Sequence, residues 1–301
     1  NNTANGPGGA DRIDFNIAGT GAHTITLASV LPSLTEAVII DASTDDSFAA
    51  NGNRPAIVID VNGISTSNGL QLSSTADGST IRGFVIHNFT NAAIAIDAGS
   101  SGNTIAGNYL GRLDAAGNYL GGLAATNYTV QLNGDGNVIG GSTPADRNLI
   151  VGGSGNYGIY VNGAGSNNNR ISGNYFGVDP TGTNNLGNNW SAVSLFGSGT
   201  GNVIGGASAA EGNLISANGA SAIYLFGAGS GSVVQGNWIG IAATGTATLG
   251  TSTQGIEVSG TSNGVAILDN WIAGGSGDGI HVASDITGTV IQGNRIGTNL
   301  D

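Results

Sequence analysis

Short runs in which apolar and polar residues alternate recur along this chain, separated by stretches rich in Gly, Asn and Ser. A five-residue motif, Gly-Asn-Tyr-Phe-Gly in one version, returns at residues 107–111, 173–177, 236–240 and 293–297. A strand-like run such as Asn169-Arg170-Ile171-Ser172 precedes each copy. Because no helical periodicity separates the runs, the pattern predicts short β-strands that bury their apolar faces by stacking coil upon coil.

Each predicted coil opens with a first strand whose two-residue period separates an inward column from an outward one. Successive first strands begin 24 residues apart at the shortest (69 to 93) and 36 at the longest (93 to 129). Their inward positions are aliphatic, as Ile159 and Val161 illustrate, and the second strands contribute Ile105, Ile171 and Val234. Coils stacked about 4.8 Å apart would place like residues over like, so we predict an all-β parallel β-helix of about nine coils.

Loop insertions alternate between two corners of the predicted coil. Long insertions follow the third strand of every second coil, at residues 113–123, 178–189 and 241–253, and shorter ones lie at 141–146 and 207–211. We expect residues 1–68 to form an N-terminal region and opening coil with longer loops, and residues 69–301 to form the regular coils. The chain starts without Met and stops where earlier coils launch a long loop, which predicts an excised or processed piece with an uncapped C-terminal end.

A turn Asn in each coil is predicted to stack into a ladder along one corner. Asn tolerates the left-handed backbone conformation, and its amide both donates and accepts hydrogen bonds. Ligand binding by these side chains is the alternative interpretation. The predicted ladder residues are Asn88, Asn108, Asn148, Asn174, Asn213, Asn237, Asn270 and Asn294.

Several segments resemble a known class of repeats. They are residues 136–141, 147–150, 174–177 and 179–183 and the opening run 11–17. Together they resemble the right-handed parallel β-helix repeats of large secreted and cell-surface bacterial proteins, within the pectate-lyase-like class of solenoids. The resemblance covers nearly the whole chain and implies one right-handed solenoid. It implies less about activity, because such repeats serve as shafts or adhesive regions while the broader class includes polysaccharide lyases and hydrolases.

Composition limits the possible partners. The 301 residues include 55 Gly and no Cys or Lys, and 19 acidic residues against 7 basic ones leave a net charge of −12. That charge repels nucleic acid and anionic lipid surfaces, and no apolar run reaches the ~18 residues of a membrane helix. Sparse charge and abundant Asn, Gly, Ser and Thr are typical of an extracellular or cell-surface protein. Because the chain has no Cys, a disulfide framework and a thiolate metal site are excluded.

Candidate chemistry is confined to few positions. The outward column of the first strands runs from Gln71 to His281, and places Glu257 and His281 on neighbouring coils with Tyr224 beside them. A carboxylate next to an imidazole is an acid–base arrangement, so these three are the catalytic alternative. The opposite interpretation is an exposed face of mixed polar residues, because no second carboxylate or base stands on the same face.

Two further groups are candidates for binding. Asp41, Asp45 and Asp46 form the densest acidic group and are a possible Ca²⁺ site, although they lack the alternating oxygen spacing of an EF-hand loop. The residues that follow the turn Asn form an aromatic stripe, which serves as a binding surface if exposed or lies beneath the long loops if they fold back. That stripe comprises Tyr109, Tyr175, Trp238 and Trp271.

Repeat regularity and the lack of a convincing catalytic cluster favour a non-enzymatic extracellular module, structural or adhesive. It would be a shaft segment of a larger surface protein or a self-stacking filament subunit, without a cofactor. Its expected partners are further copies of itself, met end to end, or the rest of a longer chain. The alternative is a carbohydrate-binding or polysaccharide-cleaving β-helix protein whose glycan lies along the face from Gln71 to His281.

Overall fold

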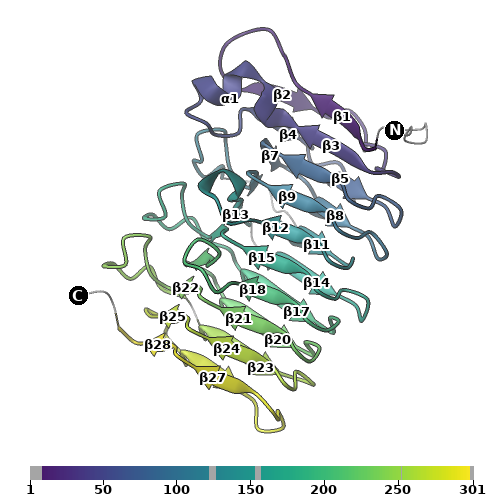
Figure 1. The fold of residues 1–301 in the computed structure, drawn as a ribbon. Coiled ribbons are helices and arrows are strands. Elements are labelled where there is room, and N and C mark those ends of the chain that lie inside the picture. Colours follow the sequence, from purple (N-terminus) through teal and green to yellow (C-terminus); the bar gives the residue numbers. More distant parts are fainter. Residues whose placement is uncertain (1–8, 122–126, 153–156, 252, 299–301) are drawn as a thin grey trace.

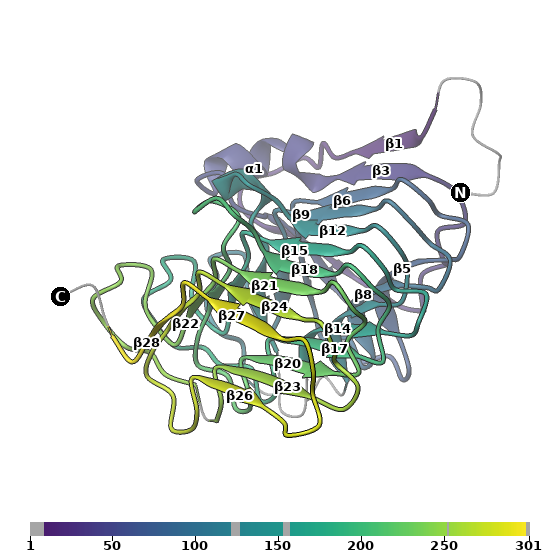
Figure 2. The same cartoon turned by 60° about the horizontal axis from the view of Figure 1, so that its bottom comes forward.

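The computed structural model describes residues 9–121, 127–152, 157–251 and 253–298. It confirms the predicted fold class, a right-handed parallel β-helix whose coils stack from β1 at one end to β27 and β28 at the other (Figure 1). Viewed closer to the axis, the strands form three sides of the solenoid (Figure 2). We call these sides sheets A, B and C.

Every described strand belongs to one of the three sheets. Sheet A contains β1 (Asp11–Asp14), β3 (Val38–Asp41), β6 (Thr80–Arg82), β9 (Thr104–Ala106), β12 (Val138–Gly140), β15 (Arg170–Ser172), β18 (Val203–Gly205), β21 (Val233–Gln235), β24 (Ala266–Leu268) and β27 (Val290–Gln292). Sheet B contains β2 (His23–Thr26), β4 (Ile57–Asp60), β7 (Phe84–His87), β10 (Tyr109–Gly111), β13 (Leu149–Val151), β16 (Tyr175–Phe176), β19 (Leu214–Ile215), β22 (Trp238–Ile239), β25 (Trp271–Ile272) and β28 (Arg295–Ile296). Sheet C contains β5 (Asn68–Leu72), β8 (Ala92–Ile96), β11 (Tyr128–Leu132), β14 (Tyr157–Asn162), β17 (Val193–Phe196), β20 (Ile223–Phe226), β23 (Ile256–Ser259) and β26 (Ile280–Val282).

Parallel pairing between successive coils places like residues above one another. In sheet A, Ile105, Ile139, Ile171 and Ile204 are register partners from coil to coil, and all four are buried. Phe176 is their counterpart in sheet B, pairs with Ile150 and Ile215, and is also buried. The inward columns of the three sheets therefore meet in one continuous hydrophobic core, as the two-residue alternation predicts.

The opening coils differ from the rest because their connections are longer. A 3₁₀ turn (Ala42–Thr44) and the short helix α1 (Asp46–Ala50) fill the segment between β3 and β4, and a second 3₁₀ turn occupies Pro144–Asp146. The connection between β2 and β3 reaches the sheet C side with a single bridge from Leu34 to Leu72. None of the helices in the described ranges has the length and apolar character needed to cross a membrane.

An Asn ladder closes the corner between sheets A and B. In each step, the backbone N–H and the side-chain amide of one Asn both donate to the Oδ1 of the Asn in the next coil, at 2.9 to 3.2 Å. Gly173 precedes Asn174 because the turn needs a φ of +69°, and a Cβ would collide with the carbonyl oxygen of Gly141. The ladder comprises Asn108, Asn148, Asn174, Asn213, Asn237, Asn270 and Asn294.

Asn88 does not belong to this ladder, so its placement there is wrong. The pairing of Tyr109 with Val85 puts Phe84 in the ladder position of that coil, and the Phe84 N–H donates to Oδ1 of Asn108 at 3.0 Å. Asn88 lies four residues further on, with a φ of +57°, and donates to Asp60. The ladder Asn residues do not have a positive φ, and in the turn at Asn174 it is the preceding Gly173 that is left-handed, so the tolerance of Asn for the left-handed conformation applies to Asn88 and not to the ladder.

A second Asn ladder, at the corner between sheets C and A, escaped the sequence reasoning. Asn103, Asn137, Asn169 and Asn202 are buried, and each of the first three donates its backbone N–H to Oδ1 of the next at 2.9 to 3.0 Å. Each stands one residue before a strand of sheet A. Their regular position before the Ile column was a signal available in the sequence.

Replacing Asn174 with Ala should lower the free energy of unfolding by about 3 kcal/mol, because the buried N–H and side-chain amide of Asn148 both lose their acceptor. Chemical denaturation of the purified variant measures the change. Asn189→Ala, at an exposed position, is the matched control and should stay within about 0.5 kcal/mol of the parent. Equal stability of the two variants would contradict the ladder's structural role.

Candidate functional site

The outer face of sheet C brings together the residues named as a catalytic alternative. Tyr224 on β20 is the register partner of Glu257 on β23, and Glu257 is the partner of His281 on β26. Neighbouring strands lie about 4.8 Å apart, so the three half-buried side chains leave the sheet side by side. The parallel register therefore produces the juxtaposition that the outward column predicts.

Each of the two titratable groups has a partner of its own. The Glu257 carboxylate accepts a hydrogen bond from the Ser221 hydroxyl at 2.6 Å. His281 Nδ1 lies 3.1 Å from a carboxylate oxygen of Asp278, three residues earlier on the same coil. A carboxylate at Nδ1 favours the tautomer with its proton there, which leaves Nε2 to accept a proton or, once charged, to donate one. Asp278 is the second carboxylate that the sequence reasoning did not place on this face.

Aromatic side chains cover the adjoining part of the same face. Tyr128 and Tyr160 stack with ring centroids 4.5 Å apart, Tyr160 continues to Phe196 at 5.8 Å, and Phe196 continues to Phe226 at 4.9 Å. The interplanar angles of these three pairs lie between 18° and 28°. We call the whole set the aromatic row: Tyr128, Tyr157, Tyr160, Trp190, Phe196, Tyr224 and Phe226.

The aromatic row is partly open to solvent and ends at the acid–base group. Trp190 is 49% exposed and Phe226 is 38% exposed, while the five other rings are half-buried. The row crosses the four adjacent strands β11, β14, β17 and β20, and Tyr224 is its last member before Glu257. Flat apolar rings followed by two carboxylates and an imidazole make a surface that holds a chain-like ligand and offers proton transfer at one end.

Sequence reasoning found only Tyr160 and Tyr224 of this row. Phe196 and Phe226 stand two residues after Ser194 and Tyr224, so extending the outward parity by one step would have found them. Tyr128 and Tyr157 share the parity of the inward column, and they join the outer face because they stand at the corner where the strands begin. Trp190 lies in a loop, where strand parity has no meaning.

The aromatic stripe on sheet B is largely covered. Tyr109 is 8% exposed and packs with Leu113 from the long insertion that follows it, and Trp271 is 6% exposed and donates to the Thr298 carbonyl oxygen. The two remaining members, Tyr175 and Trp238, are half-buried and line a cleft. Of the two alternatives for the stripe, the covered one therefore holds for Tyr109 and Trp271, the first beneath its long insertion and the second against Trp238 and the Thr298 carbonyl.

The acidic group in the opening coil has structural partners. Asp41 caps the 3₁₀ turn and pairs with Arg12 and Arg82. Asp45 is buried; burial acts to raise its pKa, but hydrogen bonds from the Ile17 and Ser47 N–H groups and the Ser47 hydroxyl outweigh burial and lower it. Asp46 lies in the first turn of α1. Across the described ranges, His, Asp and Glu side chains form no group of three that could hold a metal ion.

Comparison with known proteins rests on structure alone. No protein-family model matches the sequence, and no curated protein sequence is similar to it. The fold is similar to that of a periplasmic alginate epimerase, with 14% identity and a TM-score of 0.54 over 86% of this chain. The chain spans about half of that enzyme, 55% of its length.

Two weaker likenesses accompany it. The A-module of a mannuronan C-5 epimerase from Azotobacter vinelandii is 15% identical, with a TM-score of 0.37 over 96% of this chain and 91% of the module. The catalytic domain of an α-1,3-glucanase is 12% identical, with a TM-score of 0.35 over 97% of this chain and 68% of that domain.

The expected function is corrected by this comparison. A non-enzymatic structural or adhesive module, working as a shaft or filament, is contradicted, because the structural neighbour with a TM-score above 0.5 is an alginate epimerase. The assignment of the chain as a non-enzyme is wrong for the same reason. The likeness at 14% identity establishes the parallel β-helix, so any activity has to be argued from this chain's own residues.

Packing within the aromatic row should be visible in an alkaline titration. Burial, reinforced by the neighbouring Tyr128 and Tyr157, raises the pKa of Tyr160 from 10.0 to about 12. Tyr160 should therefore ionise late among the tyrosines, and a near-ultraviolet tyrosinate titration of Tyr160→Phe should lose that alkaline step. Because the folded pKa lies above the unfolded one, the stability contributed by the neutral phenol is present below pH 10 and is lost as the pH rises toward 12. An unchanged titration curve would contradict this packing.

Proposed function

We propose that this chain is a carbohydrate-active protein that binds a glycan along the outer face of sheet C and cleaves it beside Glu257 and His281. The single observation that carries the proposal is the continuity of the aromatic row with the acid–base group. Polysaccharides are long and present flat apolar ring faces, and a row of rings across four strands offers repeated stacking sites along one direction.

The chemistry of the face favours a glycan with little or no charge. None of the strands of sheet C contains an Arg, so no strand of this face supplies a guanidinium for an acidic sugar. Burial raises the pKa of Tyr157, so its phenol stays neutral and available as a donor. Neutral hydroxyl groups of sugars form hydrogen bonds with such a surface without needing a counter-charge.

The cleavage step fits the three groups at the end of the row. Glu257 and Asp278 supply two carboxylates, and His281 is the register partner of Glu257 and contacts Asp278. Glycosidic cleavage needs one group that protonates the leaving oxygen and another that assists attack on the sugar carbon. We assign proton delivery to the imidazole that Asp278 orients, and the second role to Glu257.

Export from the cell is part of the proposal. The chain has no Cys or Lys and few charges, and its structural neighbour is a periplasmic enzyme. Extracellular polysaccharides are accessible only to an exported or surface-exposed protein.

Removing the exposed rings should weaken glycan binding. Trp190→Ala and Phe226→Ala should each lower affinity for the neutral polysaccharide that binds best in a panel by about tenfold, because each removes a stacking surface. Affinity gel electrophoresis or calorimetry with the panel measures this. Tyr119→Ala, an exposed ring outside sheet C, is the matched control and should leave affinity unchanged. Unaltered binding by all three variants would place the glycan elsewhere.

Removing the acid–base groups should abolish turnover while binding persists. Glu257→Gln and His281→Ala should each reduce the rate of release of new reducing ends by about 100-fold or more, because each removes a proton donor or acceptor. Asp285→Asn, an exposed carboxylate on the turn after β26, is the matched control. Full activity of Glu257→Gln, or no cleavage of any polysaccharide by the parent protein, would refute the enzymatic part.

A further inference from the structure

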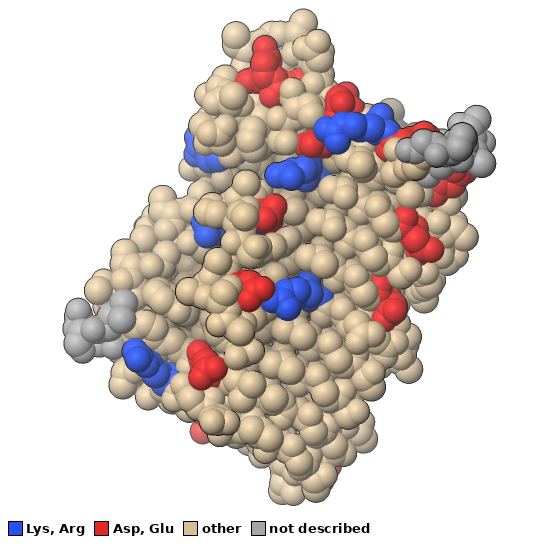
Figure 3. Space-filling model, in the orientation of Figure 1, with Lys and Arg blue, Asp and Glu red and all other residues tan. Residues whose placement is uncertain are grey.

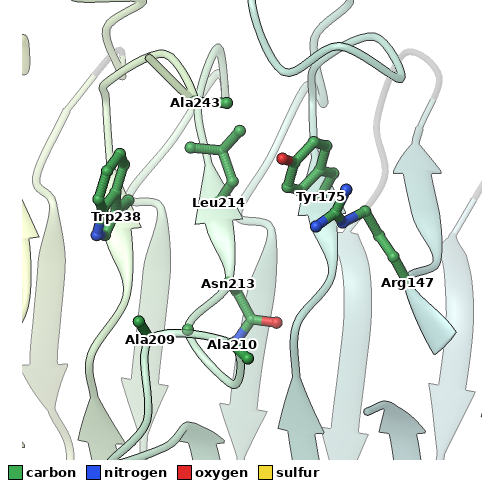
Figure 4. A pocket seen from close by; sticks show the side chains of 9 residues that line it. Arg147, Tyr175, Ala209, Ala210, Asn213, Leu214, Trp238 and Ala243 are labelled. Atoms are coloured by element: carbon green, nitrogen blue, oxygen red, sulfur yellow. The ribbon is translucent and has the colours of Figure 1, made fainter. Parts of the chain in front are cut away.

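A cleft on the outer face of sheet B is separate from the aromatic row. It has a volume of about 190 Å³ and lies over β16, β19 and β22, which contribute Tyr175, Leu214 and Trp238 to its floor (Figure 4). Arg147, which precedes β13, reaches across so that its guanidinium stands over the Tyr175 ring, 3.9 Å from the centroid. The cleft thus combines aromatic faces with one cation.

Linked loops form one wall of this region. The long insertions bond to each other: the Ala243 N–H donates to the Gly182 carbonyl at 2.9 Å, and Asn185 donates to the Leu249 carbonyl at 3.0 Å. On the opposite side, the cleft is bounded by Ala209 and Ala210 of the short insertion. Because coil-to-coil hydrogen bonds hold the strands and these bonds hold the loops, the site is preformed.

The charge of Arg147 is not compensated by the described part of the chain. Three other Arg residues are in ion pairs: Arg12 with Asp14 and Asp41, Arg82 with Asp41, and Arg170 with Glu211. No described carboxylate lies within ion-pair distance of Arg147, and its Nε is buried without a hydrogen-bond partner among the described residues. The adjacent Asp146 carboxylate accepts instead from Thr143. Because that Nε has almost no exposed surface, an anionic ligand in the cleft would bind the terminal Nη groups, which share the same positive charge.

The wider surface makes this unpaired cation more informative. On the face shown in Figure 3, the basic areas are small and scattered, and several lie beside acidic ones. With a net charge of −12, the protein as a whole repels anions. An anion would therefore bind only where a local cation is free of acidic neighbours.

A second cleft continues the first toward the N-terminal end. It has a volume of about 170 Å³, shares Arg147 and Tyr175 with the first cleft, and adds Arg54, Tyr109 and Pro180. The Arg54 guanidinium donates to the carbonyl oxygens of Asn51 and Ala116. Two cations and several ring faces therefore lie along one path, with the Arg147–Tyr175 pair between the two clefts.

We propose that these two clefts form a binding site for a carboxylate-bearing sugar chain, with one sugar carboxylate held by Arg147 and the adjoining rings stacked on Tyr175 and Trp238. The planar guanidinium matches a carboxylate with two parallel hydrogen bonds, and the aromatic faces match sugar rings. This site lies on a different sheet from the cleavage site and does not depend on it.

Calorimetric titration with an oligomer of galacturonic acid, and with its methyl ester as the neutral match, tests the site. The acid should bind to the parent protein about tenfold or more tightly than the ester, and Arg147→Gln should remove that difference. Arg147→Lys should restore only part of it, because the ammonium keeps the charge but not the planar fork. Arg170→Gln, an Arg already paired with Glu211, is the control and should bind like the parent.

Several outcomes would overturn the assignment. Equal binding of acid and ester, absence of binding by the acid, or unchanged preference in Arg147→Gln with a parent-like thermal unfolding curve each refute it. Loss of acid binding in Trp190→Ala would also refute it, since that ring belongs to sheet C. Preference for the acid that survives in Glu257→Gln, while cleavage is lost, would show that the two sites are separate.

Discussion

Every part of this structure depends on hydrogen bonding between successive coils. Each strand bonds to the same strand of the coil before and after it, so position along the solenoid is set by main-chain geometry rather than by side-chain packing alone. The corners need the same continuity, and the two Asn ladders supply it with amides that donate and accept at once. Buried polar groups that are fully paired in this way rigidify the corners instead of weakening the core.

That rigidity explains why both candidate sites lie on sheet faces. Residues at equivalent positions in consecutive coils lie one strand spacing apart, so a row of side chains on one face becomes an extended surface for an extended ligand. On sheet C this surface is the aromatic row that leads to Glu257 and His281. On sheet B, Tyr109 lies beneath a long insertion and Trp271 is also buried, while Tyr175 and Trp238 line a cleft with Arg147. The same repeat therefore presents two faces of different chemistry. The strands of sheet C contain no Arg, whereas the cleft on sheet B includes the guanidinium of Arg147, which has no ion-pair partner among the described residues.

The correction of the expected function has a physical basis. The candidate acid–base group is not encoded in a contiguous motif, so the regular repeats by themselves resemble a structural shaft. Asp278 and His281 are close in sequence, but Glu257 precedes them by a whole coil, and Ser221 precedes Glu257 by another. Only the coil-to-coil register brings them to one place, so a motif search along the chain has nothing to detect.

Alternation and repetition in the sequence were sufficient for the fold class, the inward columns and most of the ladder, since these follow from a two-residue period and a stacked repeat. Asn174 and Phe176 show this directly, one in the corner ladder and one in the core. Asn88 shows the limit, because a turn Asn occurs at both ends of a strand and only the pairing with the next coil identifies which end it is. Tyr175, Trp190 and Arg147 show what tertiary structure alone decided. Their exposure and partners depend on how loops from neighbouring coils fold over the sheets, and such contacts between separate coils leave no periodic trace in the sequence.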